Sequence, residues 1–123
     1  MSARRQYLRL RRERLIFDVC SASFGTYWFF SCRFGEIDLV MEDRTTLVFV
    51  EVKFRKDSRH GSGADAVTSR KQGRISRTAS WYLANKPHRA EQTCRFDVIS
   101  IAEDKGGQDI NWIRNAFEVN TGQ

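Results

Sequence analysis

Two charged residues interrupt the most apolar stretch of this chain. Glu51 and Lys53 directly follow the run Leu47–Val50. Because side chains two residues apart on a strand point to the same face, both charges lie on one face of the predicted strand. An apolar strand of this kind is normally covered on both faces by the rest of the protein. A carboxylate and an ammonium in this position therefore indicate either a buried ion pair between strands or a site for chemistry.

A second carboxylate is expected beside the first. The strand-like stretch Glu36–Met41 precedes the apolar run, and the turn-prone residues 42–46 separate the two. If the two stretches form a hairpin, Asp38 lies close to Glu51 and Lys53, and Glu36 points to the same face as Asp38. Two carboxylates and an ammonium can hold a divalent cation that activates water at a phosphodiester. The alternative is a purely structural Glu–Lys pair.

Length and composition predict one globular domain. The chain has 123 residues, of which 41% are hydrophobic and 12% aromatic, enough for a packed core. The sequence contains no run of about 18 apolar residues that would predict a membrane span, and its arginine-rich start does not resemble a secretory signal. We therefore expect a cytoplasmic protein. The tryptophans, expected in the core, are Trp28, Trp81 and Trp112. The cysteines, expected as reduced thiols because no CxxC spacing occurs, are Cys20, Cys32 and Cys94.

Charge is unevenly distributed along the chain. The formal net charge is +6, with basic residues concentrated in 1–14 and 53–77 and acidic residues in 36–51. Cations that neutralise a phosphate backbone, placed around carboxylates that hold a metal, are typical of a metal-dependent nuclease. The alternative is an ordinary basic protein with an acidic hairpin.

The pattern of apolar residues predicts an α/β fold, with a mixed central β-sheet flanked by helices. Strands are expected at 36–41, 47–54, 95–101 and 110–113, with a further pair between 15 and 32. Helices are expected at 3–14 and at 64–85, where Val67 belongs to the apolar face and Pro87 ends the helix. The stretches 55–63 and 103–109 are polar and contain glycine, so they are expected to be loops.

Four blocks of the sequence are similar to one known family. The blocks are Gly35–Val40, Val48–Arg55, Arg95–Val98 and Ile113–Phe117. In order and spacing they resemble the YraN family of small bacterial proteins, which is related to archaeal Holliday-junction resolvases within the PD-(D/E)XK nuclease superfamily. The resemblance covers residues 32–118 as a family-like core of the single domain 1–123. Residues 1–31 form an atypical amino-terminal region, without the Gly-x-x-Gly-Glu-type helix that usually opens the family.

The resemblance implies a restriction-endonuclease-like core with Asp38, Glu51 and Lys53 as catalytic residues. Asp38 and Glu51 would bind Mg²⁺ or Mn²⁺, and Lys53 would orient a water molecule or stabilise the transition state. The implied activity is that of a metal-dependent endonuclease acting on structured or branched DNA, as Holliday-junction resolvases do. Because such junctions have two-fold symmetry, a homodimer is expected by analogy.

Basic side chains near this site are candidates for contacts with the DNA backbone. They are Arg55, Arg70, Lys71 and Arg74, with Arg77 a further candidate on the same helix. The resemblance also places Lys71 and Gln72 in a region where relatives have a residue facing the site. The alternative for each is a solvated helix face or loop.

Two other functions compete with the nuclease hypothesis. One is a catalytically inactive nucleic-acid-binding module of the same fold, which the atypical residues 1–31 favour. The other is a structural or interaction protein whose basic helix binds an acidic partner.

Overall fold

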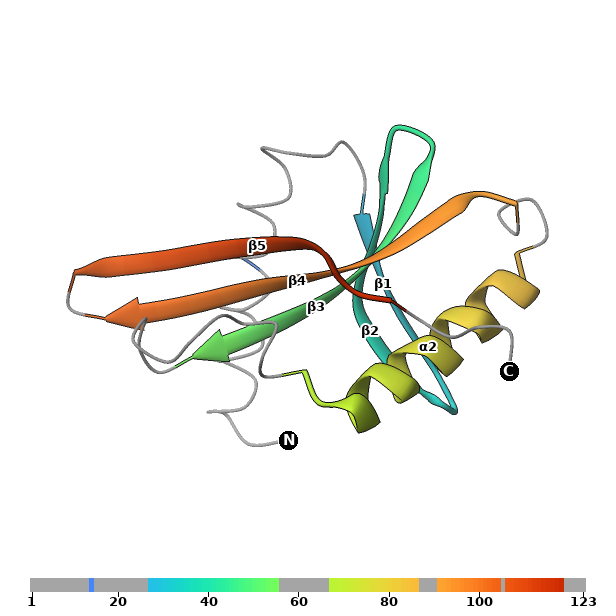
Figure 1. The fold of residues 1–123 in the computed structure, drawn as a ribbon, viewed down its shortest axis with the longest axis horizontal. Helices are drawn as coiled ribbons and strands as arrows, with labels where there is room; N and C mark the ends of the chain where they lie inside the picture. The colour runs from blue at the N-terminus through green and yellow to red at the C-terminus, as the bar shows by residue number, and fades with distance from the viewer. Residues whose placement is uncertain (1–13, 15–26, 56–66, 87–90, 105, 119–123) are drawn as a thin grey trace.

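A five-stranded sheet with one helix packed on one of its faces makes up most of the described part of the chain (Figure 1). The computed structural model describes residues 14, 27–55, 67–86, 91–104 and 106–118. The elements are β1 (Tyr27–Cys32), β2 (Gly35–Asp43), β3 (Thr46–Arg55), α2 (Ser69–Ala84), β4 (Thr93–Asp104) and β5 (Gly107–Phe117). The strands lie in the order β1-β2-β3-β4-β5, with β3 and β4 parallel and the other neighbours antiparallel. The predicted α/β class with a mixed sheet is confirmed.

The predicted hairpin forms between β2 and β3, and its strands are longer than expected. Glu42 pairs with Leu47 and Asp43 with Thr46, so the turn is reduced from the expected 42–46 to Arg44 and Thr45. Arg44 has a φ of 57°, a conformation that tight turns require. The strands continue through polar residues because ladder hydrogen bonds join backbone atoms, whatever the side chain.

The prediction of a loop at 103–109 and a short strand at 110–113 was wrong. β4 continues to Asp104 and β5 begins at Gly107, with these two residues paired across a tight hairpin. Gly107 has a φ of 115°, which glycine adopts without strain. The polar composition of this stretch hid its strands, because half-exposed antiparallel strands tolerate polar side chains on one face.

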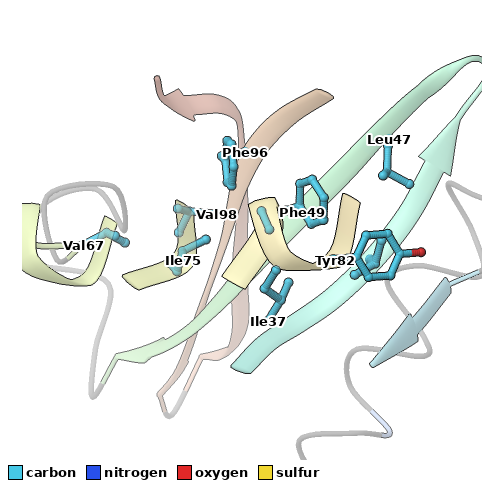
Figure 2. Packing of buried hydrophobic residues seen from close by; sticks show 10 residues of the cluster. Ile37, Leu47, Phe49, Val67, Ile75, Tyr82, Phe96 and Val98 are labelled. Carbon is cyan, nitrogen blue, oxygen red and sulfur yellow. The ribbon is translucent and has the colours of Figure 1, made fainter. Parts of the chain in front are cut away.

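The helix α2 covers one face of the sheet with an apolar stripe (Figure 2). Ile75 and Tyr82 of α2 pack on Phe49 of β3 and Phe96 of β4 in one buried cluster, and the rings of Tyr82 and Phe49 lie 5.8 Å apart. The helix begins later than expected. The hydroxyl of Thr68 caps it by accepting a hydrogen bond from the backbone N–H of Lys71 at 3.2 Å. Val67 is buried in the cluster but precedes the helix.

The opposite face of the sheet is also buried, as expected for an apolar central strand. Its cluster comprises Leu39, Met41, Val48, Val50, Val52, Ile99 and Ile101, with Trp112 packed against it. Trp28 packs on the α2 side and is partly buried. Trp81 differs from the prediction, since 36% of it is exposed. It is not among the buried residues of α2, and its ring lies 5.9 Å from that of Phe30 in β1.

Several predictions lie outside the described residues. They are the helix at 3–14, the strand content of 15–26, the loop residues 56–63, Cys20 and Pro87. Cys32 and Cys94 are free thiols and partly buried. Within the described segments, no helix combines the length and apolar character needed to cross a membrane.

Candidate active site

Asp38 lies at a bulge in β2. Trp28 of β1 pairs with Val40, and Phe30 pairs with Ile37. Between these two pairs, β2 therefore has one residue more than β1. Ile37 and Val40 therefore both join the cluster under α2, which regular alternation would forbid. Bulges of this kind redirect side chains and are frequent beside active sites.

The carboxylate of Asp38 is attached to the neighbouring strand. Its Oδ2 accepts a hydrogen bond from the backbone N–H of Val52 at 2.8 Å. The regular pairing between β2 and β3 ends at Leu39 and Val50, so this bond lies just beyond the last backbone pair. A side chain thus satisfies a strand N–H where the ladder stops. The bond fixes the carboxylate of Asp38 beside the second half of β3.

Glu51 is buried beneath the first turn of α2. It alternates with Phe49 along β3 and so faces the helix, and only 7% of its side chain is exposed. The ammonium of Lys71 lies 2.5 Å from Oε1 of Glu51, and 35% of the lysine side chain is exposed. Lys71 therefore reaches back from α2 to Glu51 on the sheet.

The two carboxylates and two lysines influence one another. Burial raises the pKa of Glu51, the negative charge of Asp38 raises it further, and Lys71 acts in the opposite direction. Burial and the charge of Lys71 lower the pKa of Lys53, against the effect of Glu51 and Asp38. The predicted convergence of Asp38, Glu51 and Lys53 is therefore present in the structure, with Lys71 as a fourth member. These four residues are called the carboxylate–lysine cluster below.

Ser100 adjoins this cluster and was not among the predicted site residues. It is the Cα partner of Lys53 in the parallel pair of β3 and β4, so both side chains point to the α2 face. Ser100 is fully buried, and its hydroxyl has no hydrogen-bond partner in the described part of the chain. The signal in the sequence was a hydroxyl in line with Phe96 and Val98 on an otherwise apolar strand face.

The other predicted site residues whose side chains are described lie outside the cluster. Arg70 and Arg74 are exposed on α2, and Glu36 is exposed at the start of β2. The side chain of Arg55 lies outside what the structure describes. The side-chain amide of Gln72 donates a hydrogen bond to the carbonyl oxygen of Val67 at 3.0 Å.

The donor set suits a hard divalent cation with an incomplete protein shell. Carboxylate oxygens are the ligands preferred by Mg²⁺ and Mn²⁺, and a cation between Asp38 and Glu51 would relieve the repulsion that raises the pKa of Glu51. Among the described residues, no group of three or more His, Cys, Asp or Glu side chains is placed to hold a metal. Water and substrate phosphate oxygens would complete the shell, as is usual for Mg²⁺.

A separate apolar pocket lies under the second half of α2. Its volume is about 290 Å³. It is lined by Phe49, Ala79, Ser80, Leu83, Gln92, Cys94 and Phe96. Burial raises the pKa of the Cys94 thiol, which keeps it protonated and poorly nucleophilic. The chemistry-bearing residues therefore lie at the carboxylate–lysine cluster and not in this pocket.

Comparison with known proteins places the chain in a family. Residues 28–101 match the family model described as "Uncharacterised protein family UPF0102". The chain is 46% identical over 90 residues to a UPF0102 protein of Nitrosococcus oceani, covering 73% of each chain. It is 47% identical over 91 residues to a UPF0102 protein of Nitrosospira multiformis, covering 74% of each. The chain belongs to the UPF0102 (YraN) family.

Proposed function

We propose that this protein is a cytoplasmic, metal-dependent nuclease that acts on structured or branched DNA, with Asp38, Glu51 and Lys53 as catalytic residues on a restriction-endonuclease-like core. The observation that carries the proposal is the burial of Glu51 beside a second carboxylate and two ammonium groups. A structural ion pair needs only one charge of each sign, whereas here a second carboxylate and a second ammonium act on the pair. Clusters of mutually perturbed groups are more typical of functional sites.

The surroundings of the cluster suit a phosphate group. The first turn of α2 contains no acidic residue and carries Arg70 and Lys71. The amino-terminal end of a helix attracts anions through its unpaired N–H groups and its dipole. A phosphate oxygen and the two carboxylates can then share one divalent cation. The helix end favours binding of the phosphate, and the burial of Glu51 favours neutralisation of its carboxylate by the cation.

Each member of the cluster has a distinct part in the proposed chemistry. Asp38 and Glu51 would hold Mg²⁺ or Mn²⁺, which would supply Lewis acidity at the phosphate and would lower the pKa of a bound water molecule. Asp38 is oriented by the N–H of Val52, and Glu51 is paired with Lys71, with which the ion would compete. Lys53 lies beside both carboxylates and stabilises negative charge that develops on the phosphate oxygens.

The proposal is tested by cleavage of a labelled four-way DNA junction with Mn²⁺ or Mg²⁺. We expect cleavage to need the metal and to fall about 100- to 1000-fold in Glu51→Gln and in Lys53→Met, because each removes one preorganised charge. Glu91→Gln is the matched control. Glu91 is exposed and precedes β4, whose first residue pairs with Thr46 at the other end of β3. Cleavage that survives both site substitutions would refute this assignment.

The specific observation that favours an inactive binding module is the ion pair between Lys71 and Glu51. This pair already neutralises the more buried carboxylate, and the described residues supply no third acidic ligand. The two functions are separated by binding of Mn²⁺ measured by electron paramagnetic resonance. A nuclease binds Mn²⁺ in wild type and loses it in Glu51→Gln, whereas the inactive module binds DNA without a site for the ion.

A homodimer would place two such sites on a two-fold junction, and we include this assembly in the proposal. Light scattering with size-exclusion chromatography gives the mass of the protein with and without junction DNA. A mass of one chain in both conditions would remove the dimer from the proposal and leave the site unaffected.

A further inference from the structure

The helix α2 has two flanks of opposite character. Residues spaced by four, three and four positions share one side of a helix. One such series is exposed and basic, and consists of Arg70, Arg74, Arg77 and Trp81. The other has the same spacing without any charge, and consists of Ser69, Gly73, Ser76 and Ser80. We call the first series the arginine flank. The arginines of α2 are therefore gathered on one side of the helix.

The arginine flank continues onto the turn between β1 and β2. A Cβ atom at Gly35 would lie 3.3 Å from side-chain carbons of Arg74, so the turn and the helix are in direct contact (Figure 1). Further along, the ring of Trp81 lies 5.9 Å from that of Phe30 in β1. The exposed turn adds Arg33, whose guanidinium lies 4.9 Å from the ring of Phe34.

The combined surface carries positive charge that the described residues do not neutralise. Neither Arg33 nor any arginine of the flank forms an ion pair with a residue that the structure describes. The series from Arg70 to Trp81 spans about 16 Å at the rise of an α-helix. Its first member is the chain neighbour of Lys71, which contacts Glu51. The surface therefore leads from the β1 edge of the sheet to the carboxylate–lysine cluster.

Two exposed aromatic rings on this surface favour an unpaired strand over a duplex. Phe34 is 38% exposed and Trp81 is 36% exposed, and both lie among the arginines. Arginines alone would suit the phosphates of a duplex or of a single strand. Exposed rings add stacking surfaces for bases, and only bases that are not already stacked in a duplex can use them.

We propose that the arginine flank, together with Arg33 and Phe34, binds an unpaired DNA strand and directs it towards Glu51. The binding itself needs no metal, and the inference rests on the proposed function for the destination of the strand and for DNA as the nucleic acid. It narrows the substrate to DNA that has an unpaired arm or segment next to the bond to be cut.

The test is fluorescence anisotropy in the presence of a chelator, with a labelled unpaired oligonucleotide of about 12 residues and a duplex hairpin of similar charge. The chelator prevents cleavage, so binding is measured alone. The double variant Arg74→Gln/Arg77→Gln removes two exposed charges from the flank. We expect the dependence of log K on log salt for the single strand to become shallower by about 1.4, which is 0.7 per lost phosphate contact.

A matched control removes the same charge elsewhere. Arg44→Gln/Arg114→Gln alters the β2–β3 turn and β5, the latter on the edge of the sheet opposite β1. We expect its salt dependence to equal that of the wild type. Equal losses in both double variants would overturn the inference, because net charge alone would then explain binding.

The aromatic contribution is tested with Phe34→Ser, which lies in a turn and leaves the core intact. We expect about tenfold weaker binding of the unpaired strand and unchanged binding of the duplex. Equal weakening of both ligands would overturn the preference for unpaired DNA. The variant Glu91→Gln, whose side chain is exposed and lies outside this surface, should bind the strand as the wild type does. A protein that never cleaves but shows this pattern would refute the nuclease proposal and support the present one.

Discussion

Two buried carboxylates on opposite faces of the sheet have very different surroundings. Asp97 of β4 is completely buried and accepts hydrogen bonds from Nε of Arg95 at 3.1 Å, Nε1 of Trp112 at 2.9 Å and the backbone N–H of Asn115 at 2.9 Å. Arg95 also contacts Asp43 of β2 at 2.9 Å. Asn115 has a φ of 52° and lies where the register between β4 and β5 shifts. Asp97 therefore holds an irregular segment of β5 in place.

Glu51 has the reverse arrangement. Its carboxylate forms an ion pair with one ammonium, that of the partly exposed Lys71, while burial and then the charge of the nearby Asp38 raise the pKa of Glu51. Asp97 is surrounded by donors that stabilise its charge. A buried acid that is fully hydrogen-bonded has a structural part, whereas one that is crowded by like charge is available for a ligand. Asp97 belongs to a block that resembles the family, so position in such a block does not by itself indicate catalysis.

The largest expected effect is on stability, from Asp97→Asn. Loss of the charge removes the buried partner of Arg95, which is itself partly buried and keeps Asp43, and breaking a buried pair typically costs about 3–5 kcal/mol. Urea denaturation should show this decrease in the free energy of unfolding, with Glu91→Gln unchanged. A variant that keeps its stability but loses cleavage would place Asp97 in the active site and end the contrast with Glu51.

The second effect is the pH dependence of stability in Glu51→Gln, measured without metal. Because the folded-state pKa of Glu51 is raised above 4.5, its carboxyl group favours folding below the unfolded-state pKa, and this contribution is lost as pH rises through the folded-state value. The glutamine variant cannot ionise. Its melting temperature relative to wild type should therefore increase as the pH is raised from about 4 to 7. A constant difference across this range would contradict the crowding of Glu51.

A smaller effect is expected in the affinity for Mn²⁺ of Lys71→Met. The ammonium of Lys71 competes with a cation for Glu51. Its removal should tighten binding of Mn²⁺ up to about tenfold, which corresponds to about 1.4 kcal/mol. Titration calorimetry measures this change, and Arg70→Gln serves as the control because Arg70 is exposed one position away. Weaker binding in Lys71→Met would mean that the lysine organises the site instead of competing in it.

The smallest effect is expected from Ser100→Ala. The hydroxyl of Ser100 is buried without a partner among the described residues, so its removal should change the free energy of unfolding by less than about 1 kcal/mol, in the stabilising direction. Thermal denaturation provides the comparison, with Thr78→Val removing a second buried hydroxyl, one that donates to the carbonyl of Arg74 at 2.9 Å. A clear loss of stability in Ser100→Ala would show that its hydroxyl is bonded.

The sequence predicted the hairpin and the convergence of its charged residues because both depend on local patterns. Period-two alternation and an apolar run define β2 and β3, and spacing along β3 places Glu51 and Lys53 on one face. The length of β5 and the exposure of Trp81 were predicted wrongly. Polar strands carry little local signal, and a tryptophan on a helix flank is exposed or buried according to what lies next to it.

Chain order and side-chain chemistry alone determined that this protein is an α/β domain with two acids and a lysine near one strand end. Only the tertiary structure decided that a bulge places Asp38 beside Val52, that Lys71 reaches Glu51, and that Ser100 stands next to Lys53. These relations join residues on different elements. They depend on strand register and helix placement, which arise from packing of the whole sheet and have no counterpart in local sequence.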